Sequence, residues 1–282
     1  MKKTIYFLLT KSIGLYINFL SFVLPKKATA LAYSLFSEPR DGKLTAATLP
    51  EILQKAETRT FTHNEASFQT YTWKGNESVI LLVHGWESNA SRWEKMLPYL
   101  QQTGSTIIAI DGPAHGLSSG KEFNIPQYAS FIDIVVQEFK PQHLIGHSLG
   151  GKTCLYYQST YQNTSIKKMV VLGAPSDFKI ILKNYINLLS LNASISKGLE
   201  TYYLNHFKLK LENFSGKIFA STIITKGLVA HDADDKVVLF EEGKKIASSW
   251  KDSVFIKTKG LGHSMHDDEL YKKVSAFLFE SN

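Results

Sequence analysis

The chain has 282 residues, of which 44% are hydrophobic and 20% are charged, and its formal net charge is +7. A chain of this length and composition can bury a large core, which excludes an intrinsically disordered protein. The single cysteine, Cys154, excludes an intramolecular disulfide framework and a cysteine-rich zinc site.

The positive charge is concentrated near the N-terminus. Residues 1–45 hold seven basic and two acidic side chains, a net charge of +5, whereas the rest of the chain holds 25 basic and 23 acidic ones. A nucleic-acid-binding domain needs a basic face on its folded body. The rest of the chain has no stretch that is dense in Lys and Arg, so we expect no nucleic-acid partner.

The first predicted element is an apolar helix, IYFLLTKSIGLYINFLSFVL over residues 5–24, with two lysines before it and two soon after it. At 100° per residue, Thr4, Lys11 and Asn18 form a narrow polar stripe along an apolar rod. This pattern suits a helix that lies in a membrane interface. Three other interpretations stay open: a helix packed on the protein's own body, a single membrane span and a cleaved signal peptide.

Strands and helices alternate through the rest of the chain. We predict strands at residues 59–63, 68–73, 78–84, 105–111, 143–146, 168–172, 223–230 and 254–257. We predict helices at residues 47–56, 91–102, 125–139, 150–162, 178–189, 194–211, 239–249 and 268–279. Continuous apolar runs such as SVILLVH and STIIAID are typical of strands that are buried on both faces. The pattern therefore predicts an α/β fold with a mostly parallel central sheet and helices on both faces.

The alternation is interrupted over residues 176–219, which contain helical pieces and no turn-bounded strand. We expect this insertion to form a helical cap over the sheet edge where a ligand would bind; an ordinary long crossover of two helices is the alternative. The predicted organisation is therefore an N-terminal apolar and basic helical segment over residues 1–45 and an α/β domain over residues 46–282 that carries the cap.

The strongest chemical signal is the sequence GHSLG at residues 146–150, a G-x-S-x-G motif between a predicted strand and a predicted helix. Gly146 and Gly150 allow a sharp turn, which lifts the Ser148 hydroxyl to the carboxyl edge of the sheet. A serine hydroxyl needs a base to become a good nucleophile, and the base needs an acid to orient it. Both are expected on loops after later strands.

Two later loops supply these groups, HDADDKVV at residues 231–238 and KGLGH at residues 259–263. With LVHGW at residues 82–86 and DGPAHGLS at residues 111–118, these motifs resemble the serine hydrolases of the α/β-hydrolase superfamily from about residue 60 to the C-terminus. The resemblance implies an α/β-hydrolase fold. It also implies cleavage of a carboxylic ester or thioester by a Ser-His-Asp triad through an acyl-enzyme, without a cofactor or a metal.

The acid of the family follows the pattern His-Gly-x-x-Asp-x-x-Val, which residues 231–238 match except at the glycine. The resemblance therefore implies that Asp235 is the acid. Asp232 stands where the family has glycine, so Asp232 and Asp234 stay open as rival acids. Asp177 is a further rival, because some members of the family carry the acid after the preceding strand.

The resemblance also implies the base and the oxyanion hole. His263, in its Gly-x-Gly-His context, is the expected base. The backbone N–H groups of Trp86 and Leu149 are expected to hold the oxyanion. His84 and Gly85 would allow their loop to approach the nucleophile closely.

Other interpretations remain beside this one. His263, His266 and Asp267 could be metal ligands, but the triad already accounts for the first of them. A C–C bond hydrolase would use the same triad, and a non-enzymatic small-molecule receptor could share the fold. We expect a small hydrophobic ester or thioester as the substrate, because the insertion is apolar. We expect a cytoplasmic protein, with a membrane surface as the candidate partner of residues 1–27; export and a single-span anchor stay open, and the sequence does not indicate the oligomeric state.

Overall fold

The computed structural model describes residues 2–279 and the side chains from Ile5 onward. The chain forms two compact units. The sheet unit comprises Pro39–Ser176 and Gly216–Asn282, and the helical unit comprises Met1–Glu38 and Asp177–Ser215. Most of the predicted N-terminal segment and most of the predicted insertion therefore contribute to one unit.

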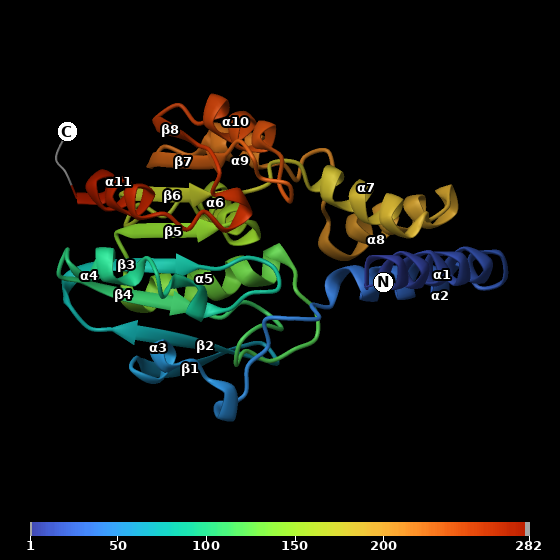
Figure 1. Ribbon diagram of the computed structural model, residues 1–282, viewed down its shortest axis with the longest axis horizontal. Helices are drawn as coiled ribbons and strands as arrows, with labels where there is room; N and C mark the ends of the chain where they lie inside the picture. Colours follow the sequence, from blue (N-terminus) through green and yellow to red (C-terminus); the bar gives the residue numbers. More distant parts are fainter. Residues whose placement is uncertain (1, 280–282) are drawn as a thin grey trace. The chain divides into compact units, whose positions relative to one another are not determined.

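The sheet unit is built on an eight-stranded sheet with the order β1-β2-β4-β3-β5-β6-β7-β8, counted over residues 2–279 (Figure 1). The strands are β1 Glu57–His63, β2 Ala66–Trp73, β3 Asn76–Val83, β4 Ser105–Ile110, β5 His143–His147, β6 Lys168–Leu172, β7 Lys226–Asp232 and β8 Ser253–Thr258. Neighbouring strands from β4 to β8 are parallel, whereas β2 is antiparallel to β1 and to β4. This confirms the predicted mostly parallel sheet.

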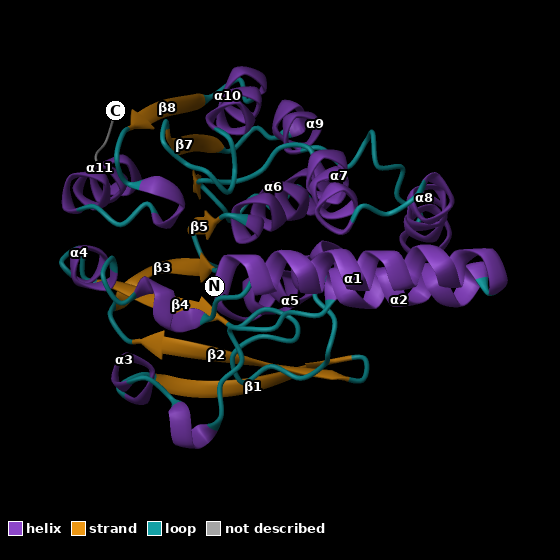
Figure 2. Cartoon of the chain, turned by 45° about the vertical axis from the view of Figure 1, so that its right-hand side comes forward, coloured by secondary structure: helices purple, strands orange, loops and turns teal. Residues whose placement is uncertain are grey.

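Helices cover both faces of this sheet (Figure 2). They are α3 Glu51–Gln54, α4 Leu97–Gln101, α5 Ile125–Phe139, α6 Leu149–Tyr161, α9 Gly216–Thr222, α10 Phe240–Ser249 and α11 Asp268–Phe279, with short 3₁₀ turns η1 Ala46–Thr48, η2 Ala90–Trp93 and η3 Gly262–Ser264. Helices α4 and α11 share one face, where Ile80 of β3, Leu97 of α4 and Val274 of α11 belong to one buried cluster. Helices α5, α6, α9 and α10 lie on the other face.

Two predicted helices are each replaced by a 3₁₀ turn and a short helix, and proline explains both. Residues 47–56 form η1 and the short α3, because Leu49 precedes Pro50 and adopts an extended backbone with ψ 121°. Residues 91–102 form η2 and the short α4, because Pro98 lacks the N–H that a longer helix would need and therefore lies in its first turn.

The chain leaves the sheet unit at Ser176 and returns at Gly216, and hydrogen bonds join the two ends. The Gly216 N–H donates to the Ser176 carbonyl over 2.8 Å, and the Lys217 N–H donates to the Ser176 hydroxyl over 3.0 Å. The buried Glu242 carboxylate accepts the Ser176 N–H over 3.0 Å, and the buried Lys152 ammonium donates to the Ser176 carbonyl. The chain therefore leaves and re-enters the sheet unit at two neighbouring residues.

The helical unit contains α1 Lys2–Val23, α2 Pro25–Ser37, α7 Phe178–Leu189 and α8 Ala193–Phe207. Aromatic side chains of α2 pack on the insertion helices: the Tyr33 ring lies 4.1 Å from the Tyr202 ring, and the Phe36 ring lies 6.0 Å from the Phe178 ring and 5.0 Å from the Tyr185 ring. These contacts join two segments that are far apart in the sequence.

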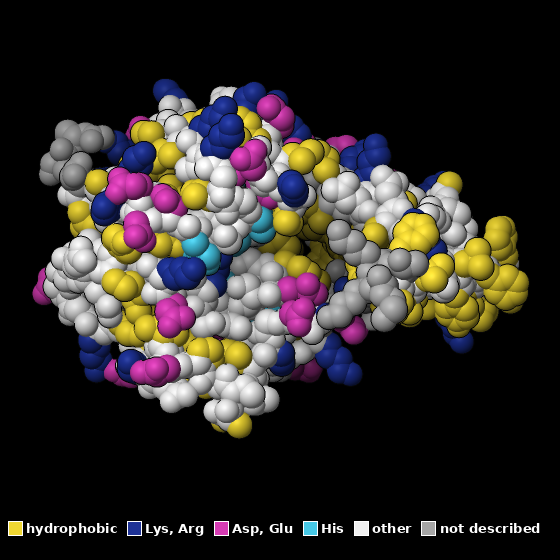
Figure 3. Space-filling model, in the orientation of Figure 1, with side chains coloured by type: hydrophobic (Ala, Val, Ile, Leu, Met, Phe, Trp, Pro, Cys, Tyr) yellow, Lys and Arg dark blue, Asp and Glu magenta, His cyan; other side chains and the backbone are white. Residues whose placement is uncertain are grey.

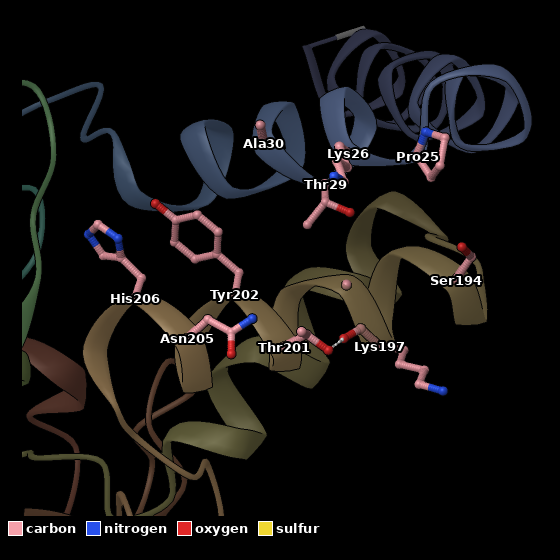
Figure 4. A pocket seen from close by; sticks show the side chains of 11 residues that line it. Pro25, Lys26, Thr29, Ala30, Ser194, Lys197, Thr201, Tyr202, Asn205 and His206 are labelled. Atoms are coloured by element: carbon pink, nitrogen blue, oxygen red, sulfur yellow. Dashed lines mark hydrogen bonds between the residues drawn. The ribbon is translucent and has the colours of Figure 1, made fainter.

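A groove of about 710 Å³ runs between α2 and α8 (Figure 4). Lys26 and Thr29 line it from α2, and Lys197, Tyr202 and His206 line it from α8. Figure 4 shows the Tyr202 ring reaching towards α2. The lining contains none of the site residues that the sequence predicts.

A buried carboxylate organises the turn after β4. Asp111 accepts hydrogen bonds of 2.9 Å from the Tyr71 hydroxyl and from the Leu117 and Ala90 N–H groups. Burial raises the pKa of Asp111 to about 6. Gly116 has a φ of 49°, and a Cβ built on it would lie 2.0 Å from the Asp111 carboxylate. The three donors hold this carboxylate in place, so it cannot move away from a larger residue.

We therefore expect Gly116→Ala to lower the free energy of unfolding by about 2–5 kcal/mol, through the clash and the positive φ together. Gly120→Ala is the matched control, because Gly120 has a φ of 92° but its nearest neighbouring atom would lie 4.0 Å from the new Cβ. That variant should lose only about 1–2 kcal/mol. Urea unfolding of both variants measures the difference, and equal losses would contradict the proposed clash.

Candidate active site

Ser148 occupies a strained turn between β5 and α6. Its φ of 54° and ψ of −126° are unusual for a residue with a side chain and typically cost about 1–3 kcal/mol. Glycines make the turn possible: a Cβ on Gly146 would lie 2.6 Å from Gly151 Cα, and one on Gly150 would lie 2.2 Å from the Val83 carbonyl oxygen. The turn therefore presents the serine at the carboxyl edge of the sheet.

Both predicted carriers of the oxyanion N–H groups belong to the segments around Ser148. Leu149 is the first residue of α6, so its N–H has no acceptor within the helix and lies at the positive end of the helix dipole. A Cβ on Gly85 would lie only 2.8 Å from Ser148 Cβ, so the loop that continues into Trp86 packs directly on the serine. The half-buried Trp86 ring packs on Phe123, 5.7 Å away.

A chain of hydrogen bonds runs from Ser148 through His263 to Asp235. The distance from His263 Nε2 to Ser148 Oγ is 2.9 Å, and the distance from His263 Nδ1 to Asp235 Oδ2 is 2.7 Å. His263 lies in η3 after β8, and Asp235 follows β7. With the acid ionised, Nδ1 carries the imidazole proton and Nε2 accepts the serine hydroxyl.

Asp235 is buried, yet its surroundings favour the ionised form. Burial would raise the pKa of Asp235, but the hydrogen bonds from His263 and from the Val238 and Val237 N–H groups outweigh it and lower the pKa below its usual value. The two N–H groups donate to Oδ1 over 2.9 Å and 2.8 Å. The buried His231 adds a hydrogen bond of 2.9 Å to the Val238 carbonyl, which fixes the loop that carries Asp235.

None of the three rival acids makes the hydrogen bond that the structure gives to His263 Nδ1. Asp232 is buried and accepts the N–H groups of Leu261 and Gly262 over 3.0 Å and 3.1 Å. Asp234 is exposed. Asp177 belongs to the helical unit and accepts the Ser215 hydroxyl over 2.6 Å. Asp232 therefore holds the backbone that leads to His263.

Two side chains that the sequence analysis did not assign hold the loop of His263. The His147 Nε2–H donates to the His263 carbonyl over 2.7 Å, and the two rings lie 5.0 Å apart. Burial lowers the pKa of His147 well below its usual value, so this imidazole is neutral. Arg92 in η2 donates to the Ser264 carbonyl over 2.9 Å. The motif GHSLG contains His147, but no local pattern indicates a contact with a residue 116 positions later.

Two further buried histidines fix the loop after β3. The His84 Nε2 accepts the Gly112 N–H over 2.8 Å, and its Nδ1–H donates to the Gly85 carbonyl over 2.7 Å. Burial lowers the pKa of His84 well below its usual value and lowers that of His115 to about 4. The His115 Nε2 accepts the Glu87 N–H over 2.9 Å. Both rings are neutral and form hydrogen bonds with the backbone of the residues on either side of Trp86.

The alternative of a metal site is not supported by the contacts of its residues. His266 is hydrogen-bonded to the Tyr271 hydroxyl, and the Asp267 carboxylate accepts the Leu270 N–H over 2.7 Å at the start of α11. Over the part of the chain that the structure describes, no group of three His, Cys, Asp or Glu side chains could hold a metal ion.

Comparisons with known proteins identify the fold family of the chain. Residues 78–229, more than half of the chain, match the family model described as alpha/beta hydrolase fold. A serine hydrolase-like protein of Danio rerio is 33% identical over 88 residues, which cover 29% of this chain and 27% of that protein. The matches to the first three curated relatives span between 27% and 49% of each relative's own length.

Solved structures share the fold over a larger part of the chain. Est1E from Butyrivibrio proteoclasticus, solved with ferulic acid bound, has a TM-score of 0.65 at 16% identity, covering 79% of this chain and 98% of that chain. A meta-cleavage product hydrolase from Pseudomonas fluorescens has a TM-score of 0.57 at 16% identity, covering 76% and 96%. At these identities the likeness concerns the fold alone.

The contacts of the acid loop predict how Ser148 reacts with a fluorophosphonate, a reagent for activated serines. Asp235→Asn should slow the labelling about a thousandfold or more, because His263 loses its orienting acceptor. Asp234→Asn is the matched control, since this exposed neighbour makes no bond to the imidazole, and it should label at the wild-type rate. Equal rates in the two variants would contradict the assignment of the acid.

A second prediction concerns His147. His147→Leu should slow the labelling of Ser148 about ten- to a hundredfold, because His263 loses a backbone hydrogen bond that sets its distance to the serine. His147→Gln can place an amide N–H near the position of Nε2 and should recover most of the rate. The labelling rates of the two variants test the positioning role, and thermal unfolding of each variant checks that the two are equally stable. A glutamine variant as slow as the leucine variant would rule out the positioning role.

Proposed function

The chain belongs to the α/β-hydrolase fold family, and from this we propose that it is a serine hydrolase that cleaves a carboxylic ester or thioester. One observation carries the proposal: the hydrogen-bonded chain from Ser148 through His263 to Asp235. Such a chain supplies a nucleophile, a base and an orienting acid within hydrogen-bond reach of one another. The strained turn at Ser148 supports the same role.

In the first half of the proposed reaction, Ser148 Oγ attacks the substrate carbonyl while His263 Nε2 takes its proton. Asp235 stays ionised, holds the Nδ1–H and stabilises the imidazolium. The N–H groups of Trp86 and Leu149 stabilise the negative charge on the tetrahedral oxygen. The intermediate then expels an alcohol or a thiol, which takes the proton from His263, and the acyl group remains on Ser148.

The second half repeats these roles with water. His263 takes a proton from a water molecule, which attacks the acyl carbonyl, and the same N–H groups hold the oxygen. Collapse of this intermediate releases the carboxylic acid, and His263 returns the proton to Ser148 Oγ. The cycle balances without a redox step and requires no cofactor.

We propose a small hydrophobic substrate, because the insertion is rich in aliphatic and aromatic side chains. The expectation that this insertion caps the site stays a prediction. A C–C bond hydrolase would use the same three groups, so the nature of the bond that is cleaved is part of the proposal. The serine at position 148 supplies the hydroxyl nucleophile that acyl transfer needs.

We also propose that the protein is cytoplasmic and peripheral on the inner face of a membrane. Residues Ile5–Val23 have a mean hydropathy of 1.4 and are long and apolar enough to cross a membrane. A signal sequence has the same composition, so the contacts of this helix are needed to choose between a peripheral helix, a membrane span and a signal sequence.

Hydrolysis of a series of p-nitrophenyl esters of increasing acyl length tests the proposed chemistry. We expect turnover by the wild type and none by Ser148→Ala, because that variant lacks the attacking oxygen. A preference for longer acyl chains would support a hydrophobic substrate. Absence of ester hydrolysis together with absence of fluorophosphonate labelling at Ser148 would overturn the proposal and favour a receptor on this fold.

A further inference from the structure

Helix α1 directs polar and small residues towards its own unit. Lys11 Nζ donates to the Asn187 and Leu188 carbonyls over 3.3 Å and 2.9 Å, where α7 ends. Asn18 Nδ2 donates to the Ser190 carbonyl over 2.8 Å. Since the carbonyls at a helix C-terminus carry partial negative charge, an ammonium group satisfies them well. The predicted polar stripe of α1 thus packs on the protein, as far as its side chains are described.

The inward side of α1 also fits closely on α7 and α8. A Cβ on Gly14 would lie 1.7 Å from the Leu189 carbonyl oxygen, so only glycine allows this approach. Asn192, which caps α8, donates its N–H to Asn18 Oδ1 over 2.8 Å and its amide to the Ser21 hydroxyl over 2.9 Å. These contacts fix which side of α1 is turned away from the unit.

Most of the surface of α1 outside these contacts is apolar and exposed, the reverse of an ordinary surface helix. Leu15, Phe19 and Phe22 are 74%, 68% and 83% exposed, and all five residues from Ile5 to Leu9 are 57–60% exposed. Figure 3 shows hydrophobic side chains gathered where α1 meets α2. An exposed apolar surface of this extent marks an interaction site.

The distribution of these side chains indicates what covers them. Five consecutive residues span 400° of helix rotation, so the run from Ile5 to Leu9 is apolar around the whole helix. A groove on a protein covers one side of a helix, whereas the lipids of one bilayer leaflet can contact every exposed side of this run. Two exposed lysines, Lys26 and Lys27, follow the apolar run, and positive charge there matches anionic headgroups.

We propose that α1 docks the protein on an anionic lipid bilayer and lies within the interface, with its Lys11 and Asn18 side turned to the protein. A spanning orientation would take the exposed Lys183 of α7 and Lys197 of α8 into the hydrocarbon, because α1 is bonded to the connection between those helices. This docking does not depend on the catalytic chemistry.

Co-sedimentation of the full chain with vesicles of phosphatidylcholine and phosphatidylglycerol tests the docking. The wild type should sediment with the vesicles, and the double variant Phe19→Asp, Phe22→Asp should bind at least about tenfold more weakly. Ile224→Asp is the matched control, because Ile224 is 81% exposed in the sheet unit, and it should bind like the wild type. Leu15→Asp serves as a second variant if the double variant fails to fold.

Several outcomes would overturn the proposal. One is a wild type that stays in the supernatant, and another is binding by the α1 variants that equals that of the wild type. The third is a wild type that forms a dimer and does not bind vesicles, with the dimer lost in the α1 variants. Alkaline carbonate should release the bound protein; retention would overturn the interfacial orientation. Hydrolysis of soluble p-nitrophenyl acetate by each variant keeps the two proposals apart, since binding without hydrolysis contradicts only the proposed function.

Discussion

The candidate site depends on one constraint, the close approach of backbones around Ser148. The serine has a φ of 54°, and the backbones around it lie so close together that a Cβ on Gly85, Gly146 or Gly150 would come within 2.8 Å of a neighbouring atom. The strain of this turn is balanced by the packing of α6 on the sheet. The same turn brings Ser148 to His263, so the fold and the chemistry rest on the same contacts.

Buried polar side chains hold the backbone of the loops around the site. Neutral histidines, kept neutral by burial, bind backbone groups beside the serine and beside the loop of Trp86. Asp232 and Arg92 bind the backbone on either side of His263. His263 therefore approaches Ser148 on a loop that His147, Asp232 and Arg92 hold in place, which is the preorganisation that the proposed acyl transfer requires.

The sequence predicted those parts of the fold that depend on local patterns. Continuous apolar runs located the buried strands. The resemblance of residues 231–238 to the family pattern implied Asp235 as the acid and left Asp232 and Asp234 open, and in the structure Asp235 is the one hydrogen-bonded to His263 Nδ1. Local periodicity misjudged residues 47–56 and 91–102, where a proline outweighs an otherwise helical pattern. The contact of His147 with the base joins distant positions, and only the tertiary fold determines it.

The N-terminal helix illustrates the same limit. Its period correctly grouped Lys11 with Asn18 on one side, but the period cannot say whether that side meets water or protein. The structure turns it towards the end of α7, where carbonyl groups satisfy the ammonium. The apolar residues of the helix therefore lie on the outer surface of the unit, where they are available to contact another molecule.

The central claim is that Ser148 carries the acyl group between the two halves of the reaction. Acid-quenched mixtures of the wild type with a p-nitrophenyl ester, analysed by mass spectrometry of the intact protein and its peptides, test it most directly. The account predicts a transient increase in mass equal to one acyl group, located on Ser148, that decays as the acid is released. Turnover without such an adduct, or an adduct on another residue, would contradict it.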